Sequence, residues 1–477
     1  MSNLLTWLGQ RRVRALALTA ALCTVASLAA CGSSGESGSQ GGGQSGGAET
    51  ITMWTLEDVQ ERIDATKKIA ADYTAKTGNK VEVVAVAEDQ FPQLITSAAA
   101  ADKLPDVIAA LGLSSVQDLA AKELLDPAAS KEVVDKLGTG TFSERALKLT
   151  QDTKGNQLAV PSDGWAQLLL YRKDWFDKAG LSAPTTYDEL MKAAQAMKTG
   201  DHAGITLATA PGDSFTQQTF EHLALANGCQ LVDNAGNITL TSPNCVQTFQ
   251  TVSDLAKKYG PAGNQDVDST RAAYFAGKAA MTIWSSFILD EMAGLRNDAL
   301  PTCKECRSDK QYLAKNTGIV SALKGPMGGP AQYGEITSFA ITDGAADATK
   351  DFVQYMMNDA YLNWLALAPE GKVPVRKGTS DEPTKFTDGW ANLEAGVDSK
   401  AKLSSIYSPE VLKELTNSPD TFQRWGIEQG KGALAGAMLS ELPVPKALSD
   451  ELNGKVDAAG AAAQAQKAVE EINKSLE

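Results

Sequence analysis

The strongest constraint on the fold is a regular alternation of strand-like and helix-like hydrophobic patterns that begins near residue 50. Short apolar runs at 51–54, 81–86 and 106–109 are separated by segments with helical spacing at 62–76 and 91–102. Further strands are expected at 168–172 and 281–284, and further helices at 187–197 and 456–472. Strand–helix–strand repetition of this kind predicts an α/β fold with a largely parallel sheet.

The expected ligand site follows from this fold class. Open parallel sheets bind ligands outside the carboxyl ends of their strands. After the first 49 residues, ~430 residues remain, which is a length typical of two or three domains. With two sheets of this kind, the gap between them is the predicted site.

The N-terminal segment predicts export and anchoring. Arg11, Arg12 and Arg14 precede a charge-free run at 15–30, which is shorter than the ~20 residues that span a bilayer. This pattern is typical of a signal peptide over 1–30. The run ends at Leu28-Ala29-Ala30-Cys31, which resembles a lipobox, so Cys31 is expected to carry a lipid.

A tether is predicted over residues 31–49, because Gly, Ser and Gln dominate there and such a composition cannot bury a core. The protein is therefore expected on the outer face of the cytoplasmic membrane. An ordinary signal peptide with a chance cysteine is the alternative. Arg11-Arg12 also leaves open whether export uses the Sec or the twin-arginine route.

The charge of the chain excludes one class of partner. Removal of the three leader arginines changes the formal net charge from −14 to −17. Because nucleic acids attract clusters of Lys and Arg, an acidic chain of this kind is not expected to bind them.

Four cysteines remain in the mature chain, and their spacing predicts two local disulfides, Cys229–Cys245 and Cys303–Cys306. Disulfides are typical of exported proteins. A zinc site and a redox Cys-x-x-Cys are the alternatives. The sequence has a single Cys-x-x-Cys, which lies in a loop-like segment, and this disfavours both.

No catalytic motif stands out. The chain has only two histidines, His202 and His222, so neither a histidine-based triad nor a multi-histidine metal site is expected. Nucleophile-elbow, Walker and His-Glu-x-x-His motifs do not occur in the sequence. We therefore expect a binding protein without catalytic residues, metal or cofactor. Pairs of carboxylates keep a glycosidase open as an alternative.

Residues 153–198 contain a run of recognisable positions in a specific order. They are Gly155, Pro161, Tyr171-Arg172-Lys173-Asp174, Phe176, Ala179-Gly180 and Pro184-Thr185-Thr186-Tyr187-Asp188-Glu189-Leu190. This segment resembles the signature of family 1 extracellular solute-binding proteins, which include the maltose- and oligosaccharide-binding lipoproteins of bacterial ABC importers. Arg172 stands where asparagine is usual. The resemblance covers roughly residues 50–475.

The resemblance implies a two-lobed periplasmic-binding-protein-like fold of type II, with a ligand cleft between lobes that are joined by crossing strands. The first lobe would comprise 50–162 plus 285–340, and the second 163–284 plus 341–477. Crossings would fall near 161–165, 283–286 and 339–342. A monomer would capture a sugar, expected to be an oligosaccharide, by lobe closure and deliver it to the membrane permease subunits of an importer.

A sugar has polar hydroxyl edges and apolar faces, so its site needs aromatic surfaces and polar groups. By resemblance, Trp165, Trp284 and Phe287 would contact it. The polar candidates are Glu57, Asp58, Glu88, Asp89, Asp163, Asp213, Gln218, Glu335, Arg376 and Glu441. Core packing is the alternative for Trp284, an interlobe spacer for Trp165, a salt bridge for Arg376 and solvated loops for the carboxylates.

Two other functions stay open at this stage. A non-sugar solute, such as a polyamine, an iron complex or a phosphate ester, is the first alternative, because fold does not fix ligand. A surface glycoside hydrolase is the second.

Overall fold

Three parallel strands, β1 (Thr50–Thr55), β2 (Lys80–Ala85) and β3 (Val107–Gly112), begin the sheet in the computed structural model, which describes residues 47–476. The remaining strands are β4 (Val160–Arg172), β5 (Met281–Ser285), β6 (Thr317–Val320), β7 (Gln332–Ile341), β8 (Val373–Pro374), β9 (Glu394–Ala395), β10 (Ala401–Lys402) and β11 (Phe422–Gln423). Nine of the strands form one sheet in the order β2-β1-β3-β7-β4-β5, with β6 and β8 pairing with β4 and β11 with β7.

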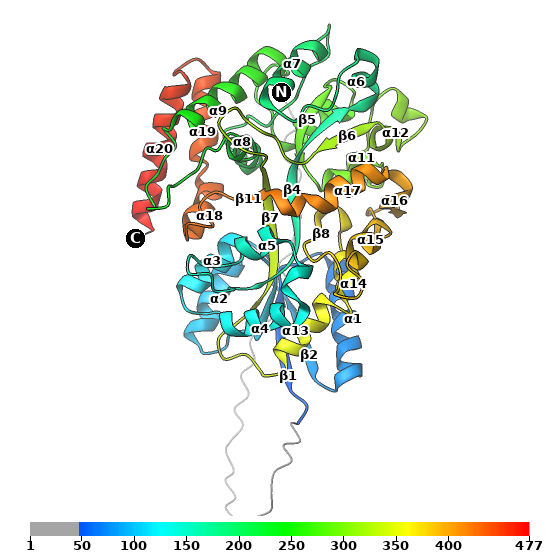
Figure 1. Cartoon of the computed structure of the whole chain (residues 1–477), viewed down its shortest axis with the longest axis vertical. Coiled ribbons are helices and arrows are strands. Elements are labelled where there is room, and N and C mark those ends of the chain that lie inside the picture. Colours follow the sequence, from blue (N-terminus) through cyan, green and yellow to red (C-terminus); the bar gives the residue numbers. More distant parts are fainter. Residues whose placement is uncertain (1–46, 477) are drawn as a thin grey trace, which may run out of the picture. The chain divides into compact units, whose positions relative to one another are not determined.

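Helices surround this sheet (Figure 1). Those in the first half of the chain are α1 (Gln60–Thr77), α2 (Phe91–Ala100), α3 (Leu113–Ala121), α4 (Pro127–Leu137), α5 (Glu144–Leu149), α6 (Lys173–Ala179), α7 (Tyr187–Met197) and α8 (Ser214–Ala226). Those that follow are α9 (Pro243–Asp254), α10 (Val267–Phe275), α11 (Ile288–Met292), α12 (Tyr312–Lys315), α13 (Thr349–Met357), α14 (Tyr361–Leu365), α15 (Lys385–Ala391), α16 (Leu403–Ile406), α17 (Pro409–Asn417), α18 (Gly432–Glu441), α19 (Pro443–Leu452) and α20 (Ala458–Ser475). Single turns include η5 (Pro369–Gly371) and η6 (Ser418–Thr421), and a π-helical turn, η2, spans Leu255–Tyr259.

Local sequence explains several element boundaries. Helix α1 ends where Gly78 adopts a left-handed conformation with φ of 83°, and its amide bonds the carbonyl of Thr74. Helix α7 begins with a capping box, in which Thr186 and Glu189 satisfy each other's free backbone amides. The sequence predicts both helices, and their observed bounds differ from the predicted ones by two residues or fewer.

Strands β4 and β7 connect the two parts of the sheet. Residues Val160–Ala166 of β4 pair antiparallel with β7, whereas Gln167–Arg172 pair with β5 and β6. Strand β7 also pairs antiparallel with β3. Figure 1 shows both strands running from the group around β1–β3 toward the group around β5 and β6. The expectation of a largely parallel sheet is therefore wrong beyond β1–β3, because β4 pairs antiparallel with all its partners and only the two-residue strand β11 pairs parallel there, with β7.

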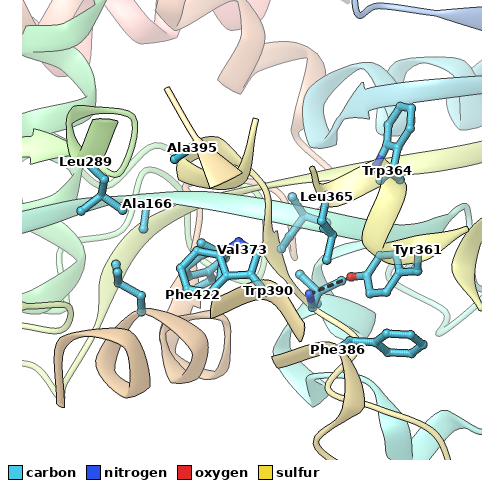
Figure 2. Close-up of a cluster of buried hydrophobic side chains, with 14 of the residues drawn as sticks. Ala166, Leu289, Tyr361, Trp364, Leu365, Val373, Phe386, Trp390, Ala395 and Phe422 are labelled. Atoms are coloured by element: carbon cyan, nitrogen blue, oxygen red, sulfur yellow. Dashed lines mark hydrogen bonds between the residues drawn. The ribbon is translucent and has the colours of Figure 1, made fainter. Parts of the chain in front are cut away.

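Hydrophobic clusters cover this connection on both sides. The first extends from β1 and α13 through β4 and β7 to Trp364 and Trp390, and Figure 2 shows part of it, including Tyr361, Trp364 and Phe386. The other contains α7, α8, α9 and α20. We call the part around β1–β3 the first lobe and the part around β5, β6, α8 and α20 the second lobe.

The contacts correct the predicted division of the chain. Helix α13 packs against α1 and α4 of the first lobe, although residues after 341 were assigned to the second. Strand β6 pairs with the second-lobe half of β4, although 285–340 were assigned to the first. The chain is thus again paired with the second-lobe half of β4 at β6. Residues 1–46, which include the predicted signal peptide and all but the last three residues of the predicted tether, lie outside the described part of the chain.

Residues 47–476 contain two disulfides, and both predicted pairings are confirmed: Cys229–Cys245 and Cys303–Cys306. All four cysteines are buried. Among the helices of residues 47–476, none has the length and apolar character that crossing a membrane requires.

Loss of the Cys229–Cys245 bond should destabilise the protein more than loss of Cys303–Cys306. Their sequence separations are 16 and 3 residues, and the chain-entropy model gives about 3 and about 2 kcal/mol for loops of these lengths. Urea unfolding of the Cys229→Ala/Cys245→Ala and Cys303→Ala/Cys306→Ala variants measures both. Equal losses, or the reverse order, would contradict this ranking.

Candidate functional site

A cavity of about 690 Å³ lies beside the β4–β7 pair, and side chains from both lobes line it. Eight of the predicted ligand residues are among its lining: Glu57, Asp58, Glu88, Asp163, Trp165, Gln218, Phe287 and Glu335. Glu57 and Asp58 follow β1, and Glu88 follows β2, so they stand at the carboxyl ends of parallel strands as expected.

Lys372 is the central charge of the cavity wall. Its ammonium group lies 2.7 Å from Glu57 Oε1 and 3.3 Å from Asp163 Oδ1. Arg62 contacts the other oxygen of Glu57 at 3.0 Å. Asp163 also accepts hydrogen bonds from the hydroxyl of Thr337 and from the indole of Trp364, each at 2.8 Å. The buried carboxylates are thus fully paired, which is the condition under which buried charge is tolerated.

These ion pairs determine the protonation states of Glu57 and Lys372. Burial raises the pKa of Glu57, but the attraction of Lys372 and Arg62 outweighs it and lowers that pKa to about 2. Burial lowers the pKa of Lys372, but Asp163 and Glu57 outweigh it and raise that pKa above its ordinary value. Glu57 and Lys372 are therefore both charged at neutral pH.

Three aromatic rings form a second wall. Trp165 on β4 is partly buried, and its ring centroid lies 5.9 Å from Phe287 and 5.6 Å from Tyr333. Trp165 packs against the hydrophobic cluster that contains α7, α8, α9 and α20, and Phe287 packs against the cluster that contains Trp364 and Trp390. An apolar surface of this kind suits the C–H face of a sugar ring.

A second ion-pair network lies behind Glu335. Arg424, which is buried, contacts Glu335 through Nη1 and Glu221 through Nε at 3.2 Å. The guanidinium carbon also lies 4.3 Å from the centre of the Tyr333 ring. Glu335 accepts a further hydrogen bond of 2.8 Å from the amide of Leu113 at the start of α3. Glu335 is thus held by β7, α3 and the segment that contains Arg424.

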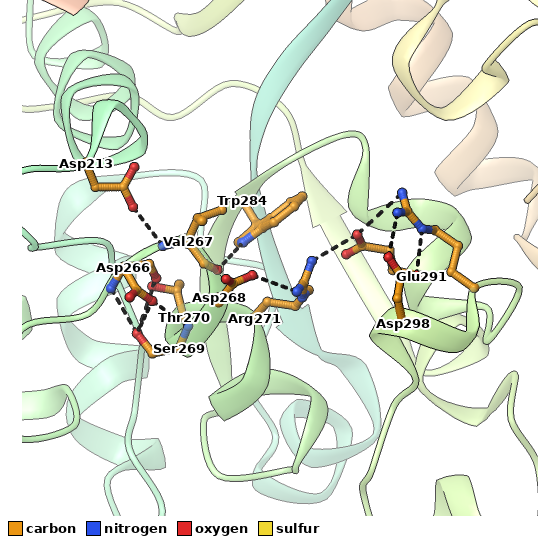
Figure 3. A network of polar contacts seen from close by, with 11 residues as sticks. Asp213, Asp266, Val267, Asp268, Ser269, Thr270, Arg271, Trp284, Glu291 and Asp298 are labelled. Carbon is orange, nitrogen blue, oxygen red and sulfur yellow. Dashed lines mark hydrogen bonds and ion pairs between the residues drawn. The ribbon is translucent and has the colours of Figure 1, made fainter. Parts of the chain in front are cut away.

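Two further predicted contact residues, Trp284 and Asp213, both form hydrogen bonds with Val267, as Figure 3 shows. Trp284 is buried among apolar side chains, and its indole donates to the carbonyl of Val267 at 3.2 Å. Asp213 caps α8, accepting from the amides of Phe215 and Val267 at 2.9 Å each. Trp284 therefore packs in the core, and Asp213 fixes α8 against α10. Neither lines the cavity.

Three further candidates are also outside the cavity lining. Arg376 is buried and donates to the carbonyls of Met357 and Leu137 at 2.7 and 2.9 Å, and it forms no ion pair within residues 47–476. It therefore ties backbone segments together. Asp89 and Glu441 are exposed next to Glu88 and Ser440, which do line the cavity.

Several residues that line the cavity were not predicted from the sequence. They include Arg62, Ser114, Ser115, Tyr333, Thr337, Lys372 and Ser440. An isolated lysine or serine belongs to no sequence motif, so nothing in the local sequence identifies Lys372 as a site residue. Thr337 and Tyr333 are detectable only from the period-two alternation of β7, which places them on the same face as Glu335.

The lining favours a polar, uncharged or cationic ligand. The cations of the wall, Arg62 and Lys372, are already paired with Glu57 and Asp163. Asp58 and Glu88 are exposed and form no ion pair within the described part of the chain. Carboxylates accept hydrogen bonds from hydroxyl groups. Residues 47–476 bring together no group of three His, Cys, Asp or Glu side chains suited to a metal ion.

The fold and the cavity between its lobes define a two-lobed solute-binding protein. The sequence pattern of bacterial extracellular solute-binding proteins matches residues 58–362, and the chain belongs to this family. It is 29% identical over 330 residues to the putative ABC transporter periplasmic-binding protein YcjN of Escherichia coli (strain K12), which covers 67% of this chain and 71% of that protein.

Solved structures share the fold at lower identity. The cyclic alpha-maltosyl-1,6-maltose binding protein from Arthrobacter globiformis aligns with a TM-score of 0.66 and 18% identity, over 89% of this chain and 98% of that one. The GacH receptor of Streptomyces glaucescens, solved without ligand and with acarbose, aligns with a TM-score of 0.62 and 18% identity, over 90% and 99%. The predicted family and the predicted two-lobed α/β fold are confirmed.

The charge network predicts a specific loss of stability in acid. The pKa of Glu57 is about 2 in the folded chain against an ordinary 4.5. The resulting stability is fully present above pH 4.5 and is lost as the pH falls toward 2, with a total of about 3 kcal/mol. Urea unfolding between pH 7 and 2 should show a shallower decline for Glu57→Gln than for wild type. Asp58→Asn is the control, because Asp58 is an exposed neighbour that forms no ion pair with any residue of 47–476. An unchanged slope in Glu57→Gln would contradict the account.

Proposed function

We propose that the chain is the substrate-binding protein of an ABC importer and that it captures a neutral carbohydrate in the cavity beside β4 and β7. The family supports the transport role. One observation carries the choice of ligand: the cavity combines the Trp165–Phe287–Tyr333 wall with the ion-paired carboxylates Glu57, Asp163 and Glu335. Such a combination suits a molecule with apolar ring faces and polar edges.

Charge supports a neutral ligand over a phosphate ester. A phosphate group requires cationic or amide donors that are free to contact it. Lys372, Arg62 and Arg424 are each paired with carboxylates, and Asp58 and Glu88 add unpaired negative charge to the lining. A dianionic ester would therefore meet net repulsion in the cavity.

The similar structures are consistent with an oligosaccharide. By their descriptions, one of them binds a cyclic maltosyl-maltose and another is complexed with acarbose. A cavity of about 690 Å³ lies within the range of small-molecule pockets. In this proposal, the ligand contacts both lobes, stabilises their closed arrangement and is transferred unchanged to the permease subunits. Membership in a family of solute-binding proteins supports this role over that of a glycoside hydrolase.

Anchoring is the second part of the proposal, and it rests on Leu28-Ala29-Ala30-Cys31 and the Gly/Ser-rich segment that follows. A lipid on Cys31 would hold the protein on the outer face of the cytoplasmic membrane beside its permease. The motif lies outside the described residues.

Trp165→Ala tests the aromatic wall. Loss of a stacking aromatic should weaken carbohydrate binding roughly 5- to 150-fold, which corresponds to about 1–3 kcal/mol. The melting temperature of the ligand-free protein should change little, because Trp165 is only partly buried. Isothermal titration with maltose-series oligosaccharides and thermal melting measure the two quantities. Trp284→Ala, in the core, is the matched control. It should lower the stability of the ligand-free protein by about 3–5 kcal/mol and leave the affinity for carbohydrate nearly unchanged. Unchanged affinity in Trp165→Ala would remove this residue from the site.

Cys31→Ser tests the anchor. Without the acceptor thiol, the protein should appear in the culture medium or retain its uncleaved leader. Cell fractionation and gel mobility distinguish these outcomes. Membrane-bound protein of normally processed size would contradict lipidation at Cys31.

A further inference from the structure

Helices α3 and α18 pack against each other at one side of the cavity, and they belong to different lobes. Helix α3 follows β3, and Val116 and Leu119 bury it in the first lobe. Helix α18 is held in the second lobe by Leu434 and Met438. Figure 1 shows the two helices adjacent to one another. Their contact is therefore part of the interface that exists only when the lobes are together.

The cavity wall continues through this contact. Ser114 and Ser115 of α3 line the cavity, as do Gly436, Leu439 and Ser440 of α18. The distance between the two helices consequently determines where the wall residues lie relative to a bound ligand.

Gly432, in the first turn of α18, makes the close approach possible. A Cβ atom at this position would lie 2.3 Å from Cβ of Gln117 and 2.9 Å from its Cγ. Those atoms lie at the base of the Gln117 side chain, so a change of rotamer cannot remove the first clash. An added methyl group would have to push α18 away from α3.

The backbone does not itself require glycine here. Gly432 has no left-handed φ, so alanine is compatible with its conformation, and alanine is the better helix former. Close approach of another backbone is the remaining physical reason for glycine. One turn later, a Cβ on Gly436 would meet Cβ of Ser114 at 3.5 Å, which is an ordinary van der Waals contact. The steric requirement is thus specific to Gly432.

We infer that Gly432 is a positioning residue for ligand binding, because it lets α18 reach α3 and so determines how far the lobes close. This inference rests on the proposed capture of a ligand by closure. A ligand that needs the closed arrangement binds in proportion to the population of that state. A side chain at 432 lowers that population without touching the ligand.

Three variants test the inference. Gly432→Ala should open the ligand-free protein, seen as a larger radius of gyration in small-angle X-ray scattering, and should weaken maltotetraose binding about tenfold or more. Gly436→Ala, the matched control on the same helix, should resemble wild type in both measurements. Adding Gln117→Gly to Gly432→Ala removes the opposing Cβ and Cγ and should restore closure and affinity.

The scattering measurement needs no ligand, so it separates this inference from the proposed function. If wild type does not bind maltotetraose, the proposed ligand fails for that sugar while the radius of gyration still tests the contact. A Gly432→Ala variant with wild-type radius and wild-type affinity would overturn the inference. So would a variant that melts early at an unchanged radius, because that result assigns Gly432 a purely structural role.

Discussion

The antiparallel pairing of β4 with β7 is the constraint on which the rest of the site depends. Its register places Asp163 opposite Thr337 and Trp165 opposite Glu335. Because side chains alternate along a strand, these four residues project from one face of the pair, and all four line the cavity. The same two strands carry the chain between the lobes. One hydrogen-bonded ladder thus joins the lobes and also supplies one wall of the candidate site.

The charged side chains next to this pair of strands form two ion-pair networks. Lys372 lies between Glu57 and Asp163, and Arg424 lies between Glu335 and Glu221. Buried ion pairs of this kind contribute little net stability, but removal of one partner is costly. Their consequence for function is that they hold carboxylate oxygens in fixed positions at the cavity edge. Fixed acceptors of this kind bind hydroxyl groups with little loss of side-chain entropy on binding.

Much of the fold could be predicted from the sequence where patterns are local. The period of the apolar residues located β1, α1, β2 and α7, and the cysteine spacing gave both disulfides. The full length of β4 was missed because Pro161 and Gly164 interrupt its pattern. Trp284 was misplaced for a different reason. An aromatic at the end of a strand fits a binding wall and a core equally well, and only contacts with Phe215 and Val267, distant in sequence, place it in the core. Lys372 could not be found, because its partners lie more than 200 residues away.

The central claim is that the cavity beside β4 and β7 binds a carbohydrate without altering it. Native mass spectrometry of the purified protein, incubated with a maltodextrin ladder and then released by denaturation, tests this most directly. The account predicts one bound sugar per chain, recovered at the mass that was added, and loss of the complex in the Trp165→Ala variant. Recovery of shortened products, or a complex that survives in Trp165→Ala at wild-type abundance, would contradict it.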